Sequence, residues 1–166
     1  MGNQFFVQQQ LIRESHEKAF AFFANPENLD AITPPWLRFR TASDLPVKME
    51  AGTTMEHTLR LHGVPIRWVT QIIEWTPPHS FTDFQEEGPF ATWTHTHEFA
   101  ITKNGTMMTD NVIYRVPGGR FGRVIDQLYV RRDINRIFGY RKRAIARLLS
   151  AQDLKDPGGL ATGSVS

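Results

Sequence analysis

The segment "FATWTHTHEF", residues 90–99, places two histidines at alternate positions of an expected strand. Successive side chains of a strand point to opposite faces, so His95 and His97 share one face with Trp93 and Phe99, while threonines occupy the other. Imidazole titrates near neutral pH and carries two ring nitrogens. The pair could therefore move protons, hydrogen-bond a ligand oxygen or coordinate a metal ion.

Three interpretations of this histidine pair follow from the residues around it. The leading one is that both imidazoles are neutral polar anchors inside an otherwise apolar pocket. General acid–base chemistry is the second, with Asp110 or Glu56 holding the required tautomer. The third is a zinc or iron site completed by His57 or Asp110. Nothing in the spacing demands a metal and no carboxylate is fixed beside the pair in the sequence, so we expect neither a metal nor a cofactor.

The hydrophobic pattern predicts the elements that position these histidines. Alternation predicts a first strand at 3–13, and two short helices follow, one capped by Ser15 and one opened by Pro26. Turn residues then separate a meander of six strands, predicted at 36–42, 52–62, 65–75, 80–87, 91–101 and 106–116. Residues 124–150 repeat apolar side chains at helical spacing and predict one long helix. The apolar stripe of this helix is Val130, Ile134, Ile137, Phe138, Ile145 and Leu148.

This order predicts an α+β fold in which a curved antiparallel sheet of about seven strands wraps around the long C-terminal helix. We expect a single domain over residues 1–151 and a flexible Gly- and Ser-rich tail over 152–166. A sheet that grips a helix in this way tends to leave a cavity between the two.

Period-two counting identifies the side chains that would face this cavity. The predicted inner face consists of Met55, His57, Leu59, Leu61, Trp68, Thr70, Ile72, Phe81, Asp83, Gln85, Trp93, His95, His97, Phe99, Met108, Asp110, Val112 and Tyr114. Aromatic residues mixed with a few polar groups are typical of ligand pockets. In the strand 65–75 the opposite face, with Val69, Ile73 and Trp75, is almost as apolar, so one slip of register would exchange the two faces.

The long helix adds Arg141, which lies near the centre of its apolar stripe. A guanidinium there needs a partner. It could pair internally with Asp83 or Asp110, or extend to the edge of the helix. Alternatively, its fork could grip a carboxylate or enolate of a ligand. The candidate ligand-binding residues are therefore His57, Trp68, Asp83, Gln85, Trp93, His95, His97, Asp110, Tyr114, Phe138 and Arg141, with His95 and His97 as the catalytic candidates.

Composition excludes several classes of protein. The 166 residues are 40% hydrophobic, carry a formal charge of +2 and contain no cysteine, which rules out disulfides, thiolate metal sites and thiol catalysis. No segment has the length of a membrane span, and the start of the chain lacks signal-peptide features, so we expect a cytoplasmic protein without stable membrane insertion. Phosphate-loop, RNA-binding and helix-turn-helix patterns are absent, and we expect no nucleic acid. Ten Lys or Arg lie between Arg115 and Arg147, most simply as the solvated side of the helix.

The order of elements resembles the helix-grip fold of the START-like SRPBCC superfamily, which includes polyketide cyclases, plant hormone-binding proteins and lipid-transfer domains. A tighter resemblance to a bacterial group of ligand-binding SRPBCC proteins is carried by "WVTQIIEWTPPHSFTDFQEEGPFATWTHTHEF", "TMMTDNVIYRVPGG" and "IFGYR". It extends over nearly the whole chain, to about Leu149. The resemblance implies a hydrophobic cavity that opens near one end of the long helix and takes a flat or oily small molecule.

Three functions are compatible with these observations. The first is binding or carriage of a small hydrophobic metabolite, cyclic or acyl-bearing. The second is an enzyme similar to polyketide cyclases or aromatases, in which His95 or His97 removes a proton next to a carbonyl and Arg141 stabilises the enolate. The third is an interaction module that uses the Arg-rich helix, with Arg132, Arg136 and Arg143, to dock an acidic partner. The sequence leaves the ligand's identity and a homodimer open.

Overall fold

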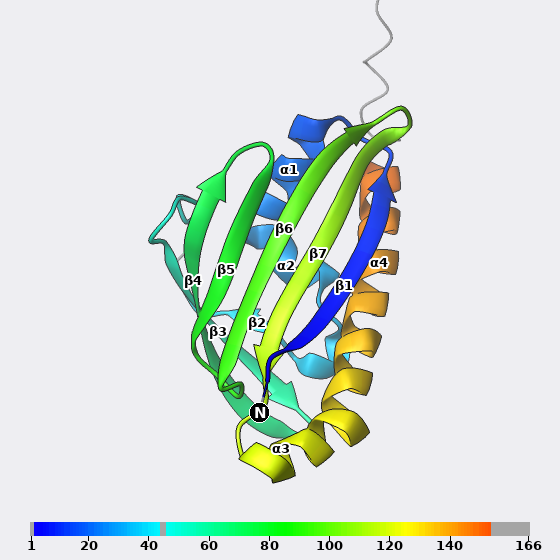
Figure 1. Ribbon diagram of the computed structural model, residues 1–166. Coiled ribbons are helices and arrows are strands. Elements are labelled where there is room, and N and C mark those ends of the chain that lie inside the picture. Colours follow the sequence, from blue (N-terminus) through cyan, green and yellow to red (C-terminus); the bar gives the residue numbers. More distant parts are fainter. Residues whose placement is uncertain (1, 44–45, 154–166) are drawn as a thin grey trace, which may run out of the picture.

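The computed structural model describes residues 2–43 and 46–153, which form one curved antiparallel sheet and a set of helices (Figure 1). Within these ranges the sheet has seven strands in the order β1-β7-β6-β5-β4-β3-β2. The strands are β1 (Gln4–Ile12), β2 (Arg40–Thr41), β3 (Thr54–Leu61), β4 (Val64–Thr76), β5 (Ser80–Glu87), β6 (Thr92–Thr102) and β7 (Gly105–Arg115). From β3 to β7 each strand pairs with the next one in sequence, and β1 closes the sheet beside β7.

The helices lie on one side of this sheet, as Figure 1 shows for α1, α2 and α4. Their bounds are α1 (His16–Ala24), α2 (Glu27–Ile32), the 3-10 turn η1 (Pro35–Leu37), α3 (Gly119–Ile125), the π-helical segment η2 (Asp126–Val130) and α4 (Arg131–Asp153). The side chain of Ser15 caps α1 by accepting a hydrogen bond from the backbone N–H of Lys18, at 3.3 Å. None of the helices in the described ranges is long and apolar enough to cross a membrane.

The predicted fold class is confirmed: a curved antiparallel sheet grips a long C-terminal helix, and two short helices follow the first strand. The helical region begins at Gly119, earlier than the predicted residue 124, and passes through the π-helical segment before α4. Of the predicted flexible tail at 152–166, residues 154–166 lie outside the described residues.

The strand predicted at 36–42 is wrong for most of its length. Pro34 and Pro35 have no backbone N–H to donate and fix the backbone for a 3-10 turn. Arg38, which ends that turn, has a left-handed φ of 46°. Pairing with β3 therefore begins only at Arg40 and is limited to two residues.

Strand β4 contains two irregularities that alternation alone did not reveal. Its register with β5 shifts between Val69 and Thr70 and again between Ile72 and Glu74. An extra residue at such a bulge turns the following side chains to the other face. As a result Trp75, predicted on the face opposite to Ile72, packs inside against Phe20.

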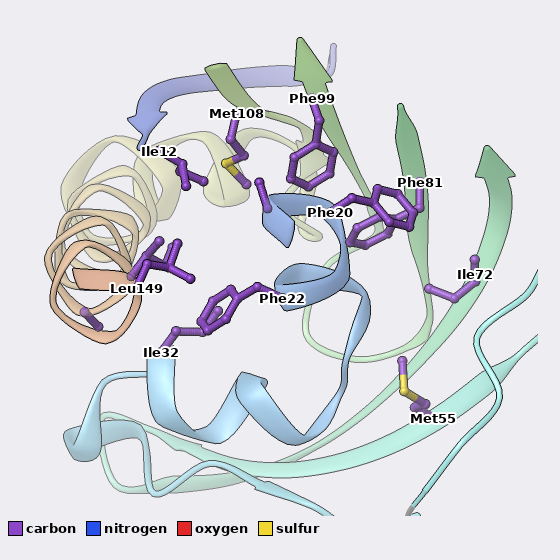
Figure 2. Close-up of a cluster of buried hydrophobic side chains, with 13 residues drawn as sticks. Ile12, Phe20, Phe22, Ile32, Met55, Ile72, Phe81, Phe99, Met108 and Leu149 are labelled. Atoms are coloured by element: carbon purple, nitrogen blue, oxygen red, sulfur yellow. The ribbon is translucent and has the colours of Figure 1, made fainter. Parts of the chain in front are cut away.

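Two clusters of buried side chains hold the sheet to the helices. The first joins α1, α2 and the end of α4 to the sheet, and Figure 2 shows its side chains from these separate elements pointing toward one another. Phe20 of α1 sits at its centre, with ring centroids 5.9 Å from Phe81 and 5.4 Å from Phe99. Such edge-to-face aromatic pairs each add about 0.5–1.5 kcal/mol to what area burial provides.

The second cluster lies toward the start of α4. Its buried members are Trp93, Val112, Tyr114, Val116, Ile134 and Phe138. Both clusters contribute residues to the wall of one cavity between the sheet and α4.

Candidate functional site

A cavity of about 490 Å³ lies against the inner face of the sheet, within the range typical of small-molecule sites. Strands β3 to β6, helices α1 and α2 and the first turns of α4 supply its wall. Eight of the predicted ligand-binding residues line it: His57, Trp68, Asp83, Trp93, His95, His97, Phe138 and Arg141. The rest of the wall is largely apolar.

The wall also contains residues that sequence reasoning had not assigned to a site. These come from α1, α2 and the segments around β2 and are Phe22, Phe23, Leu29, Ile32, Phe39 and Met49. The members from α1 and α2 have the spacing of an apolar helical stripe, but a stripe looks the same whether it faces a packed core or a cavity. No signal in the sequence separates the two cases.

Two histidines and two aspartates from three adjacent strands form a buried cluster at this wall. The register places Asp83 of β5 opposite His95 of β6, and His97 of β6 opposite Asp110 of β7. The Nε2 atom of His95 lies 2.8 Å from Oδ1 of Asp110, and Nδ1 of His97 lies 3.1 Å from the same oxygen. On the cavity side, Oδ2 of Asp83 lies 3.5 Å from His95 Nδ1 and 3.4 Å from His97 Nε2.

Burial makes the charge state of this cluster depend on its internal contacts. His95 and His97 are each 4% exposed and Asp110 is 3% exposed. Burial by itself would raise the pKa of Asp110, but the hydrogen bond with His95 and the close contact with His97 outweigh it and hold that pKa well below its usual range. Burial likewise opposes ionisation of Asp83, yet the charges of His95, His97 and Arg141 and a hydrogen bond from His97 lower its pKa. Both carboxylates are therefore ionised.

The two imidazoles differ in their protonation. For His97, burial works against the charged form, but contacts with both aspartates raise its pKa. For His95, burial and the charge of its neighbour together lower the pKa. Contacts with the aspartates therefore favour the charged form of His97 more than that of His95. The ring of His97 also stacks on Phe81, with centroids 4.3 Å apart.

Arg141 projects into the cavity from α4 and lies over the ring of Phe138, 5.4 Å from its centroid. Among the described residues, the internal pair with Asp83 or Asp110, one of the alternatives considered for its guanidinium, is not formed. Its charge still lowers the pKa of Asp83. The guanidinium therefore keeps donors that a ligand anion can use.

His57 of β3 is another buried polar group of the cavity wall, at 2% exposed. Its ring stacks on Phe39, with centroids 4.9 Å apart. Burial lowers its pKa in spite of nearby negative charges, and within the described ranges its Nδ1 atom has no hydrogen-bond partner. A buried polar atom left unpaired costs about 1–3 kcal/mol, and a polar atom of a ligand could remove that penalty.

Gln85, Asp110 and Tyr114 do not line the cavity. Gln85 instead exchanges hydrogen bonds with the backbone of Phe90, at 2.9 and 3.3 Å. The hydroxyl of Tyr114 donates to Oδ1 of fully buried Asp126, at 2.8 Å, and burial together with this bond raises the pKa of Tyr114.

Glu56, considered as a support for the histidines, points away from them. Its carboxylate accepts two hydrogen bonds from Arg67, both at 2.8 Å, on the outer face of the sheet. Those bonds lower the pKa of Glu56. Of the two acidic residues proposed to orient the histidines, only Asp110 contacts them.

Solved structures with the same fold include proteins from bacteria and plants. TTHA0849 from Thermus thermophilus matches with a TM-score of 0.68 and 17% identity, over 90% of this chain and 99% of that one. Ara h 8.0201 gives a TM-score of 0.66 and 14% identity, over 90% and 99% of the two chains. The di-domain ARO/CYC StfQ from the steffimycin biosynthetic pathway gives 0.68 and 12%, over 90% of this chain and 51% of StfQ.

No protein-family profile matches the chain, and a search of curated proteins finds no match in sequence. At the identities above, the structural matches establish the fold alone. The chain therefore shares the helix-grip fold of these structures, which is the fold that the order of its elements predicted. Its function has to be argued from the cavity.

Proposed function

We propose that the protein binds a small hydrophobic molecule, cyclic or acyl-bearing, in the cavity between the sheet and α4. The single observation that carries this proposal is the combination of about 490 Å³ of mostly apolar space with a few polar groups gathered on its wall. Burying about 300 Å² of apolar ligand surface would contribute about 7 kcal/mol before the losses of freedom on binding. Micromolar affinity requires a net gain of about 8 kcal/mol, so polar contacts of the ligand have to supply the remainder.

The polar groups give the ligand an orientation. Within the described residues, the guanidinium of Arg141 forms no ion pair and Nδ1 of His57 has no hydrogen-bond partner, and contacts with both aspartates raise the pKa of His97. A ligand with a carbonyl, enolate or carboxylate oxygen would satisfy these groups, whereas a pure hydrocarbon would leave them unpaired. The proposed ligand is therefore an oily molecule with at least one oxygen acceptor.

A fluorescence titration tests this function. The probe is 1-anilinonaphthalene-8-sulfonate, a hydrophobic anion whose emission rises in an apolar site. The variant Leu59→Trp places an indole ring in the cavity from β3. The control Ile101→Trp adds the same ring at a position of β6 that is 75% exposed. Saturable binding that is lost in Leu59→Trp and kept in Ile101→Trp is expected. Equal binding by both variants would refute the proposal.

The histidine–aspartate cluster favours one second candidate, an acid–base reaction on a carbonyl compound. A buried imidazole held by a carboxylate at 2.8 Å is arranged as in many general bases. StfQ, a di-domain ARO/CYC from the steffimycin biosynthetic pathway, has the same fold, and this likeness supports the second candidate.

Deuterium exchange tests the second candidate. The probe is 2-tetralone, whose acidic C–H bonds lie next to a carbonyl, and NMR follows their exchange in heavy water. An enzyme of this class would accelerate exchange, and His95→Gln or His97→Gln would abolish the acceleration. Exchange at the uncatalysed rate, or full acceleration in both variants, would exclude a histidine base for such substrates.

A further inference from the structure

We propose that Asp83, His95 and His97 bind a divalent transition-metal ion in the cavity wall. Each of these residues offers one ligand atom, and the three atoms all lie within 4.8 Å of one another. Sequence reasoning disfavoured a metal because no carboxylate was fixed beside the histidines. The register of β5 with β6 supplies that carboxylate, because Asp83 stands opposite His95.

The spacing of these atoms fits a tetrahedral ion. Zinc binds histidine nitrogen and carboxylate oxygen at about 2.0–2.2 Å, which places neighbouring ligand atoms of a tetrahedron about 3.3–3.5 Å apart. The Asp83 oxygen lies 3.5 Å from the nitrogen of His95 and 3.4 Å from that of His97. The two separations that involve Asp83 are therefore close to those of a loaded site.

Asp110 supports the two imidazoles from the side away from the cavity. Metal-binding histidines usually donate their other ring N–H to a carboxylate, which fixes the tautomer. Here His95 Nε2 hydrogen-bonds Oδ1 of Asp110 at 2.8 Å. His97 Nδ1 lies 3.1 Å from the same oxygen, in a direction too oblique for a full hydrogen bond. Protons on these two nitrogens leave the lone pairs of the other two facing Asp83.

Three electron-rich atoms that converge in this way repel one another unless a cation lies between them. A divalent cation bound there would balance the charges of the two carboxylates, Asp83 and Asp110.

The donor set limits the identity of the ion. Two imidazoles and one carboxylate suit zinc, iron(II) and cobalt(II), and they leave at least one coordination position open. The side chain of Asp83 is 17% exposed and all three residues line the cavity, so that position faces the cavity. If the proposed ligand binding holds, an oxygen of the ligand could occupy the open position beside Arg141; this last step rests on the proposed function.

Metal binding is measured with ZnCl2 alone, on protein stripped with a chelator, by isothermal titration calorimetry. We expect one zinc per chain. Losing an outer supporting residue alone weakens metal binding about 10- to 100-fold. Asp83→Asn, His95→Gln and His97→Gln should each therefore weaken it by more than about 100-fold. The control is His62→Gln, which removes an exposed histidine that contacts Asp133 at 2.7 Å. Absence of binding by the wild type, or equal binding by all four variants, would overturn the site.

A second measurement tests the metal site on the wild-type protein alone, so it does not depend on the folding of any variant. Wild-type protein loaded with CoCl2 should show the intense visible bands of tetrahedral cobalt. In ¹⁵N NMR of the zinc-loaded wild type, the metal should shift Nδ1 of His95 and Nε2 of His97. Weak octahedral bands, or shifts confined to other histidines, would identify surface binding and refute the proposal. No organic ligand is present in either experiment, so failure of the metal site and failure of ligand binding are separate outcomes.

Discussion

Asp110→Asn is the substitution whose effect follows most directly from the structure. The side chain keeps its shape but loses its charge, so the hydrogen bond with His95 at 2.8 Å and the contact with His97 at 3.1 Å are both weakened. Asp110 is 3% exposed, so water cannot replace what is lost. A hydrogen bond to a charged group contributes about 1.5–3 kcal/mol, and one full bond with one oblique contact gives an expected loss of about 2–4 kcal/mol.

Asp133→Asn is the matched control for this prediction. Asp133 also contacts a histidine, His62, at 2.7 Å, but that imidazole is 64% exposed. Exposed pairs contribute about 0–1 kcal/mol. The two substitutions therefore remove the same chemical contact in opposite environments.

Urea unfolding at pH 7 in the presence of EDTA measures both variants, and the chelator keeps any metal out of the comparison. We expect the midpoint for Asp110→Asn to fall by at least twice as much as that for Asp133→Asn, with unchanged slopes. Equal shifts of the two urea midpoints would refute the claim that burial makes the contacts of Asp110 contribute more to stability.

Three further predictions use other parts of the structure. Tyr114→Phe removes a buried hydrogen bond to Asp126 and should lower the free energy of unfolding by about 1.5–3 kcal/mol; an unchanged urea midpoint would contradict it. Gly105→Ala should lower the free energy of unfolding by more than about 2 kcal/mol, because φ is +128° and the added Cβ would lie 2.2 Å from the carbonyl oxygen of Ile12. A melting temperature equal to that of the wild type would contradict this prediction. Burial lowers the pKa of His57 below 6.5, so the folded state binds fewer protons than the unfolded chain and stability should fall as the pH drops through about 6.5. His57→Phe should lose that part of the acid sensitivity, and identical urea midpoints against pH for both proteins would disprove the assignment.

The fold was readable from the sequence where one pattern dominated. Period-two alternation set His95 and His97 on one face, and turn residues separated the strands correctly from β3 to β7. It failed where local backbone geometry overrode the pattern. The bulges of β4 turned Trp75 inward, and the prolines before Arg38 shortened β2.

The sequence predicted which residues belong to the site better than it predicted how they are arranged. Alternation named Asp83, His95 and His97 as inward residues, but only the register between strands shows that the carboxylate faces the two imidazoles. Nothing in the sequence pairs Tyr114 with Asp126, because that contact joins β7 to the π-helical segment. Pairwise contacts between distant elements depend on register and helix placement, which alternation does not encode.

The most direct test of the proposed ligand binding is a high-resolution electron-density map of the protein purified directly from cells. We predict density for a small hydrophobic molecule in the cavity, with an oxygen within hydrogen-bond distance of Arg141, His57 or the cluster of Asp83 and His97. A cavity filled by repacked side chains, or a molecule held elsewhere on the protein, would contradict the proposed function.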